Sequence, residues 1–170
     1  ERGRVISFEP DPINFSFLQF NSNINRCRNI LCENYGVGGK DEEKYFYRDT
    51  ETGGRRSSFR KEYVGTSYTG FSDKVRLKKF DSIVSEFGTP DFVKIDVEGF
   101  EIEVLSELTC DLENCIFLVE VRGETKNEIY DFFSKKNYDC TWVDNEDKVI
   151  KGSEEIPDFA NLIFKKIKSI

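Results

Sequence analysis

Apolar runs of strand length alternate along the chain with segments whose apolar residues recur at helical spacing. The first apolar run covers residues 5–8 and ends at an acidic residue. The segment after it places four apolar residues on one helical face: Ile13, Phe17, Phe20 and Ile24. Asp11 and Pro12 predict the start of this helix, because a carboxylate caps the first turn and proline fits the first helical position. The alternation indicates an α/β fold.

The same alternation returns after residue 80. Asp81 is predicted to cap a short helix that ends at Gly88, and Thr125 and Glu128 have the spacing of a capping box before another helix. Four further strands are predicted at residues 92–97, 116–121, 138–143 and 161–164. The last two have no helix between them and are expected to be antiparallel neighbours. The sequence therefore predicts a doubly wound, mostly parallel sheet with an antiparallel last strand.

Residues 40–75 interrupt the alternation with polar, glycine-containing stretches, and we expect an irregular hairpin insertion there. The insertion carries the one basic cluster of the chain, with Arg55, Arg56 and Arg60. Arginine side chains match phosphate and carboxylate groups, so the cluster could hold such a group on a substrate. The alternative is a solvated loop that happens to be basic.

The length and charge of the chain narrow its class. The 170 residues fit one domain, and the formal net charge of −7 disfavours nucleic acid and anionic membranes as partners. We find neither an apolar run of about 20 residues nor a signal peptide, so we expect a cytoplasmic protein. The chain has no histidine, and its five cysteines form no CxxC pair, so we expect reduced thiols rather than a metal site.

The first candidate site follows the first strand. Glu9 stands where the carboxyl end of that strand is expected, which is where doubly wound sheets bind their ligands, and a carboxylate can accept both hydroxyls of a ribose. Pro10 and Asp11 would then pass near the adenine. In the alternative interpretation, Glu9 is an ordinary charge at a strand end and Asp11 only caps the helix.

The second candidate site lies at residues 92–101. Lys94 and Asp96 interrupt an otherwise apolar strand and point to the same face. Buried charges are costly unless they are paired or used, so an ion pair of Lys94 with Asp96 or Glu120 is one explanation. The other places Asp96 at the strand tip with Glu98 just beyond it. Two carboxylates there could orient a substrate hydroxyl and take its proton.

These motifs together resemble the FkbM methyltransferases. The resemblance rests on FEPDP at residues 8–12, on Asn21 and Asn25 in the following helix, and on KIDVEGFEIEVL at residues 94–105. The segments LVEV at 118–121 and NLIF at 161–164 are similar to later strands of that family. The resemblance implies a class I methyltransferase (Rossmann-like) fold, S-adenosylmethionine as cofactor and, usually, transfer to a hydroxyl oxygen.

Carried over by position, the resemblance implies a role for each candidate. Glu9 matches the ribose-binding acid, and Asp96 matches the residue beside the methionine part of the cofactor. Glu98 matches the adjoining acid. Gly36 and Val37 follow the strand that normally supplies an adenine contact, which is a weaker match.

One feature of the FkbM family is not found in this sequence. The glycine loop of the family lies on the strand before Val5, where only Glu1, Arg2, Gly3 and Arg4 stand in this sequence. That strand would lie between the strands at residues 5–8 and 92–97. We expect the loop to lie upstream of Glu1; otherwise the chain is not an intact enzyme.

Three functions are therefore open. The leading one is an O-methyltransferase that acts on a hydroxyl of a small molecule or glycan. The second is a non-catalytic binding module derived from this fold, and the third is a nicotinamide-dependent oxidoreductase, since Glu9 would serve a dinucleotide ribose equally well.

Overall fold

The computed structural model describes residues 3–51, 54, 56–110 and 112–167. Its fold is mixed α/β, as predicted. The chain divides into two compact units, residues 1–79 and 80–170. The expectation of a single domain stays a prediction.

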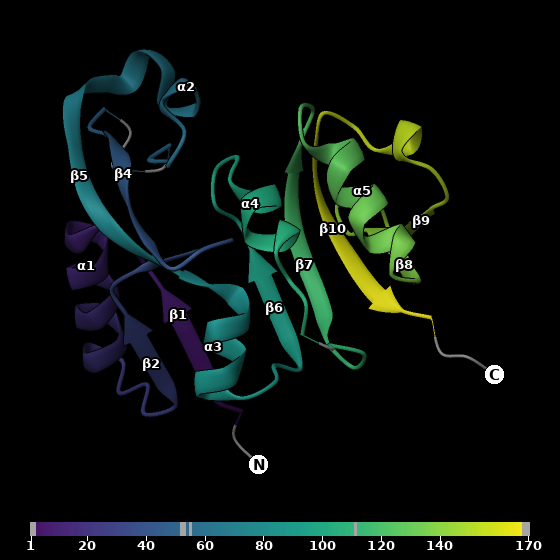
Figure 1. Cartoon of the computed structure of the whole chain (residues 1–170), viewed down its shortest axis with the longest axis horizontal. Coiled ribbons are helices and arrows are strands. Elements are labelled where there is room, and N and C mark those ends of the chain that lie inside the picture. Colours follow the sequence, from purple (N-terminus) through teal and green to yellow (C-terminus); the bar gives the residue numbers. More distant parts are fainter. Residues whose placement is uncertain (1–2, 52–53, 55, 111, 168–170) are drawn as a thin grey trace. The chain divides into compact units, whose positions relative to one another are not determined.

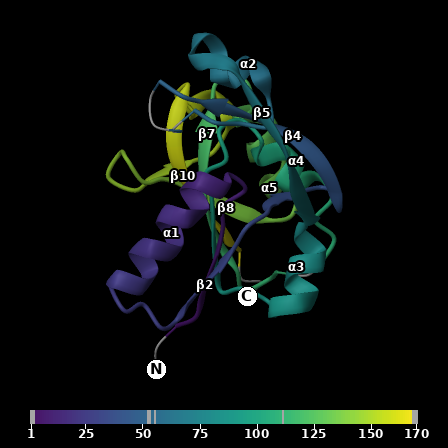
Figure 2. The same ribbon diagram turned by 90° about the vertical axis from the view of Figure 1, so that its left-hand side faces the viewer.

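The first unit contains two small sheets. Its elements are β1 (Val5–Phe8), α1 (Pro12–Ile24), β2 (Ile30–Glu33), β3 (Gly36–Gly38), β4 (Glu42–Asp49), α2 (Lys61–Val64) and β5 (Tyr68–Lys79). Strands β1 and β2 are parallel, and α1 runs beside β2 in both views of the ribbon (Figure 1, Figure 2). The second sheet has the order β3-β5-β4, in which β4 and β5 are antiparallel across the stretch for which a hairpin was predicted.

The start of α1 is as predicted. Asp11 is its N-cap, and the Asp11 carboxylate accepts hydrogen bonds from the backbone N–H of Ile13 at 2.7 Å and of Asn14 at 3.4 Å. None of the thirteen residues of α1 is buried, although all of them are described. The apolar stripe read from the sequence is therefore exposed.

The second unit is one five-stranded sheet with helices against it. Its elements are α3 (Phe80–Phe87), β6 (Phe92–Ile95), α4 (Glu101–Ser106), β7 (Ile116–Arg122), α5 (Lys126–Lys135), β8 (Tyr138–Trp142), β9 (Lys148–Ile150) and β10 (Phe159–Lys166). The strand order is β6-β7-β10-β8-β9. Among the described strands of this sheet only β6 and β7 form a parallel pair, and β10 runs antiparallel to both β7 and β8, as was expected of the last strands.

The described strands thus form three sheets instead of the single, mostly parallel sheet that was predicted. The connections explain why the five-stranded sheet is not mostly parallel. Strands β8, β9 and β10 follow one another without a crossover helix, and such connections favour antiparallel pairing.

The two faces of β7 differ in character. Phe117, Val119 and Val121 alternate along the strand and are buried. Their face belongs to the core, where Phe117 lies 5.0 Å from Phe133 of α5 between ring centroids. The residues between them point to the other face and are half-buried, and these include Glu120 and Arg122.

The two predicted helix caps differ from expectation in their side-chain bonds. Thr125 is the N-cap residue of α5, as predicted, but its side chain makes no capping bond and its hydroxyl donates to the carbonyl of Arg122. Asp81 lies inside the first turn of α3, and its carboxylate accepts from the backbone N–H of Thr109 and of Cys110. The capping patterns were correct in composition, but nearby backbone groups of the tertiary structure compete for the same side chains.

The five cysteines are free thiols in the structure. Burial raises the pKa of Cys115 and of Cys140 to about 12, so both are unreactive at neutral pH. None of the helices in the described ranges is long and apolar enough to cross a membrane.

Candidate functional site

An acidic cluster lies at the carboxyl ends of the two parallel strands of the second unit. It consists of Asp96, Glu98 and Glu120, and each offers a carboxylate oxygen within 4.8 Å of the others. The register pairs Ile95 with Val119, so the residues that follow them meet at the same end of the sheet. The sequence predicted Asp96 and Glu98 for this position, and the structure brings them together with Glu120.

Lys94 forms one of the two ion pairs that were considered. Its ammonium lies 2.9 Å from Oδ2 of Asp96. Lys94 is not a buried charge, however, because β6 is the edge strand of its sheet among the described residues and the Lys94 side chain is 57% exposed. The cost of burial therefore does not explain this pair.

Arg122 supplies the positive charge at the centre of the cluster. Its Nη2 lies 2.7 Å from Oε2 of Glu98 and 2.8 Å from Oε1 of Glu120. The sequence reasoning missed Arg122, although a signal was present. Arg122 stands two residues after Glu120 in a strand, and side chains at that spacing share a face.

The turn that carries Glu98 has a constrained backbone. Glu98 has φ 51° and Gly99 has φ 87°, so both lie in the left-handed region. A non-glycine residue there costs of order 1–3 kcal/mol unless its surroundings fix it, and such residues cluster at functional sites. The sequence did not single out this strain, because a Glu-Gly pair by itself predicts only a turn.

Glu101 holds this turn from inside the protein. Its side chain is 1% exposed, and its Oε1 accepts from the backbone N–H of Gly99 at 3.0 Å and of Val97 at 3.3 Å. Its Oε2 has no hydrogen-bond partner in the described part of the chain. The sequence analysis gave Glu101 no role of its own.

Burial and negative neighbours raise the pKa of two carboxyls of the cluster, those of Glu98 and Glu120. Burial raises the pKa of Glu98 above its ordinary 4.5, although the charge of Arg122 opposes the shift. Burial also raises the pKa of Glu120, helped by the negative charge of Asp96. A carboxylate with a raised pKa is a better general base, so Glu98 is suited to proton transfer.

The same three carboxylates have an arrangement that could hold a divalent cation. In the structure, the Arg122 guanidinium bridges Glu98 and Glu120 and supplies the counter-charge itself. A cation bound to all three would have to compete with these two ion pairs.

Stability should rise as the pH falls from 7 towards 5. Burial raises the pKa of Glu98, Glu101 and Glu120 above 4.5, so the folded state binds their protons more readily than the unfolded state. This contribution to stability is full below pH 4.5 and is lost as the pH rises through the raised values. Thermal unfolding at pH 7, 6 and 5 would measure the rise, which Glu101→Gln should reduce.

Below pH 4 the trend should reverse. Although burial opposes it, the hydrogen bonds from Thr109 and Cys110 lower the pKa of Asp81 from 3.8 to about 2. A lowered pKa stabilises the fold above the unfolded value and loses that effect as the pH falls towards 2. A melting temperature that falls steadily from pH 7 to pH 5 would contradict these assignments.

The candidate site of the first unit is built around the end of β1. Oε1 of Glu9 accepts a hydrogen bond from the backbone N–H of Asp11 at 2.8 Å, and burial raises the Glu9 pKa above 4.5. The carbonyls of Glu9 and Pro10 both accept from the side-chain amide of Asn34. Asp11 also pairs with Nε of Arg48 at 3.0 Å. The end of this strand is thus fixed by its neighbours.

The remaining predicted site residues lie elsewhere in the first unit. Gly36 and Val37 are in β3, and a Cβ at Gly36 would come within 2.7 Å of Leu77 Cδ2 and 2.9 Å of Phe59 Cζ, so these two side chains would have to shift to admit a larger residue. Arg60 lies with its guanidinium 6.0 Å from the centre of the Tyr63 ring. The backbone N–H of Arg56 donates to Asp49, and Arg55 lies outside the described residues. These contacts leave a binding role for the basic cluster as a prediction.

Comparison with known proteins decides the family. The sequence profile of the methyltransferase FkbM domain matches residues 1–140. The chain belongs to the FkbM methyltransferase family. This confirms the resemblance drawn from the sequence motifs, and the FkbM match includes both the Glu9 strand and the acidic cluster.

A solved structure agrees with the FkbM fold. The structure of methyltransferase FkbM from Methylobacillus flagellatus KT is similar over 95% of this chain, with a TM-score of 0.54 and 16% sequence identity. The chain spans only 36% of the length of that protein. A search of curated proteins gives no significant match.

Proposed function

We propose that this FkbM chain is part of an S-adenosylmethionine-dependent methyltransferase that methylates a hydroxyl of a small molecule or glycan. We further propose that its units belong to a class I methyltransferase fold. The observation that carries the proposal is the acidic cluster at the carboxyl ends of β6 and β7, built on a strained turn within the FkbM match. Family membership supports the methyl transfer, while the cofactor and the oxygen acceptor are our inference.

Glu9 is the proposed partner of the cofactor ribose. A carboxylate has two oxygens with about four lone-pair sites, so it can accept both hydroxyls of a vicinal diol even when one site is occupied. Oε1 of Glu9 already accepts from the backbone N–H of Asp11, and Oε2 accepts no hydrogen bond from the described residues. The Asp11 bond fixes the direction of the carboxylate, so Oε2 is held ready for a hydroxyl group.

Glu9→Ala in the full-length protein should weaken S-adenosylmethionine binding at least tenfold. The substitution removes charge-assisted hydrogen bonds worth about 1.5–3 kcal/mol each. Calorimetric titration would measure the change, with Glu43→Ala on an exposed part of β4 as the matched control. Unchanged affinity in a folded Glu9→Ala variant would remove Glu9 from the cofactor site.

Asp96 is the proposed partner of the amino group of the methionine moiety. Its Oδ2 already binds an ammonium group, that of Lys94, at 2.9 Å. Its Oδ1 makes none of the hydrogen bonds found in the described chain, and the Asp96 side chain is 33% exposed. The Lys94 ammonium, which Asp96 binds in the structure, is thus of the same chemical kind as the amino group that Asp96 is proposed to bind.

Glu98 is the proposed base. When bound, S-adenosylmethionine supplies a methyl group on a positive sulfur, and its displacement requires an aligned hydroxyl oxygen. Glu98 would accept the proton of that hydroxyl. The raised pKa of Glu98 favours this role, and Arg122 orients the carboxylate through Oε2.

A further inference from the structure

Helix α1 carries an exposed apolar row, which we call the α1 stripe. It consists of four side chains that are each between 53% and 64% exposed: Ile13, Phe17, Phe20 and Ile24. Their spacing of four, three and four residues keeps them on one narrow line along the helix, as in the seam of a coiled coil. A contiguous apolar row on a surface marks an interaction site, whereas single exposed apolar residues do not.

Helix α1 turns a different face to its own unit. Phe15, Leu18 and Ser22 are half-buried, and they lie about half a turn away from the α1 stripe. The helix contacts β2 and runs beside it (Figure 1). The stripe is therefore on the outer side of the helix, where the described residues leave it open to a partner.

The α1 stripe reads the same from both ends. Its order is Ile, Phe, Phe, Ile, and the spacing is symmetric about the point midway between Phe17 and Phe20. A two-fold axis at that point would place Phe17 opposite Phe20 of a second copy, and Ile13 opposite Ile24 of that copy. Two-fold dimers need a surface that complements itself, and antiparallel helices also bring opposite dipole ends together.

The absence of charge on α1 also suits a second copy of the chain. Residues 12–25 contain no charged residue, although 34% of the whole chain is charged. The positions beside the stripe carry amides and a hydroxyl: Asn14, Ser16, Asn21 and Asn23. Near a two-fold axis a charge would meet its own kind, so an uncharged rim avoids repulsion between identical copies. A different, charged partner would be matched by opposite charges, which this helix lacks.

The area of the α1 stripe fits a dimer of moderate affinity. A buried Phe covers about 150–250 Å², so the exposed parts of two Phe and two Ile offer about 400 Å² per copy. With the amide rim, two copies would bury about 1,000–1,200 Å², at the lower end of specific interfaces. We therefore expect a dimer that dissociates in the micromolar range.

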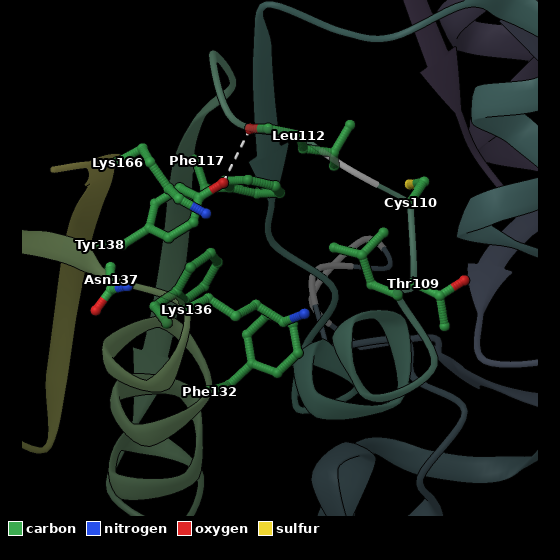
Figure 3. Close-up of a pocket in the computed structure, with 11 residues that line it drawn as sticks. Thr109, Cys110, Leu112, Phe117, Phe132, Lys136, Asn137, Tyr138 and Lys166 are labelled. Atoms are coloured by element: carbon green, nitrogen blue, oxygen red, sulfur yellow. Dashed lines mark hydrogen bonds between the residues drawn. The ribbon is translucent and has the colours of Figure 1, made fainter. Parts of the chain in front are cut away.

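The cavity of the second unit offers no comparable surface. Phe117 and Phe133, which line it, are each 1% exposed. The Lys136 ammonium lies over the Phe132 ring, 5.1 Å from its centre (Figure 3). The side chains around this cavity thus cover one another, whereas each side chain of the α1 stripe stays more than half exposed.

We propose that two copies of this protein pair through the α1 stripe, with the two helices antiparallel. Phe17 of each copy would pack against Phe20 of the other, and Ile13 and Ile24 would close the two ends of the contact. The pairing does not depend on the proposed methyl transfer, because no residue of the stripe belongs to the proposed site.

The mass of the full-length protein in solution tests this pairing. Sedimentation equilibrium at low to high micromolar concentrations should show a reversible monomer–dimer equilibrium, which Phe20→Glu should weaken at least tenfold. Phe71→Glu makes the same change at a 63% exposed position of β5 and should alter the dimer affinity less than twofold. A full-length protein that stays monomeric would overturn the proposal, because residues outside this sequence or another partner would then cover the stripe. A dimer that is unaffected by Phe20→Glu would overturn it as well.

A pair of charge variants tests the antiparallel orientation. Phe17→Lys combined with Phe20→Glu would place each new lysine opposite a new glutamate of the other copy. Phe17→Glu combined with Phe20→Glu would bring four negative charges together. The first double variant should therefore dimerise at least tenfold more tightly than the second. Equal affinities in the two variants would overturn the antiparallel pairing. Because the stripe is exposed in one copy, both variants should keep the circular dichroism spectrum of the unchanged protein.

Discussion

Glu98→Gln in the full-length protein is expected to lower methyl transfer by about a hundredfold or more while changing S-adenosylmethionine affinity less than twofold. Glutamine keeps the size of the side chain and an oxygen near Arg122, but it cannot take a proton from a hydroxyl. Glu98 sits at the turn beyond the strand and is bound through one oxygen by Arg122. The loss should therefore fall on turnover, measured as the rate of S-adenosylhomocysteine formation with saturating acceptor.

Two variants sharpen the Glu98 result. Glu107→Gln makes the same change at an exposed position after α4 and should leave turnover and affinity unaltered. Asp96→Asn should lower both donor affinity and turnover, because Asp96 is the proposed partner of the donor's amino group. A Glu98→Gln protein with full activity would show that Glu98 is not the base, and an acceptor ionised by its own chemistry would then be indicated.

Glu101→Ala is expected to destabilise the protein by about 2–4 kcal/mol. The substitution removes the acceptor of the Val97 and Gly99 backbone N–H groups, and each buried polar group without a partner costs about 1–3 kcal/mol. It also leaves a void in place of a side chain that is 1% exposed. Denaturant unfolding of the full-length protein would measure the loss.

A conservative variant separates the hydrogen bonds of Glu101 from its charge. Glu101→Gln keeps an acceptor oxygen for both N–H groups and removes a carboxylate whose pKa is raised by burial, so its stability at pH 7 should stay within about 1 kcal/mol of the unchanged protein. Glu107→Ala, at the exposed end of α4, should change stability by less than about 0.5 kcal/mol. Equal losses in Glu101→Ala and Glu107→Ala would show that Glu101 does not hold the turn.

The sequence predicted most elements of the fold, because their local signals are strong. Examples are the Asp-Pro start and apolar spacing of α1 and the apolar run of β7. It did not predict three separate sheets among the described residues. Strand pairing depends on contacts between distant segments, and the spacing of apolar residues along one segment carries no information about its partner. The same limit explains Asp81, whose carboxylate binds Thr109 far along the chain instead of capping its own helix.

The candidate site was predicted in part. Asp96 and Glu98 came from the motif, and the ion pair of Lys94 with Asp96 came from their shared face on a strand. Predicting the role of Arg122 would have required the register of a second strand. Predicting the role of Glu101 would have required knowing that the turn folds back over the start of α4. The spacing of residues along a strand predicts which side chains share a face. It does not predict which backbone groups a buried side chain binds, because these are brought together only in the folded turn.

The most direct measurement of the central proposal is calorimetric titration of the full-length protein with S-adenosylmethionine and, separately, with a nicotinamide dinucleotide. We predict micromolar binding of S-adenosylmethionine, at least tenfold loss of that binding in Glu9→Ala, and no measurable dinucleotide binding. Tight dinucleotide binding without S-adenosylmethionine binding would contradict the proposed cofactor and favour an oxidoreductase. Binding of neither compound would contradict cofactor-dependent methyl transfer and favour a non-catalytic module.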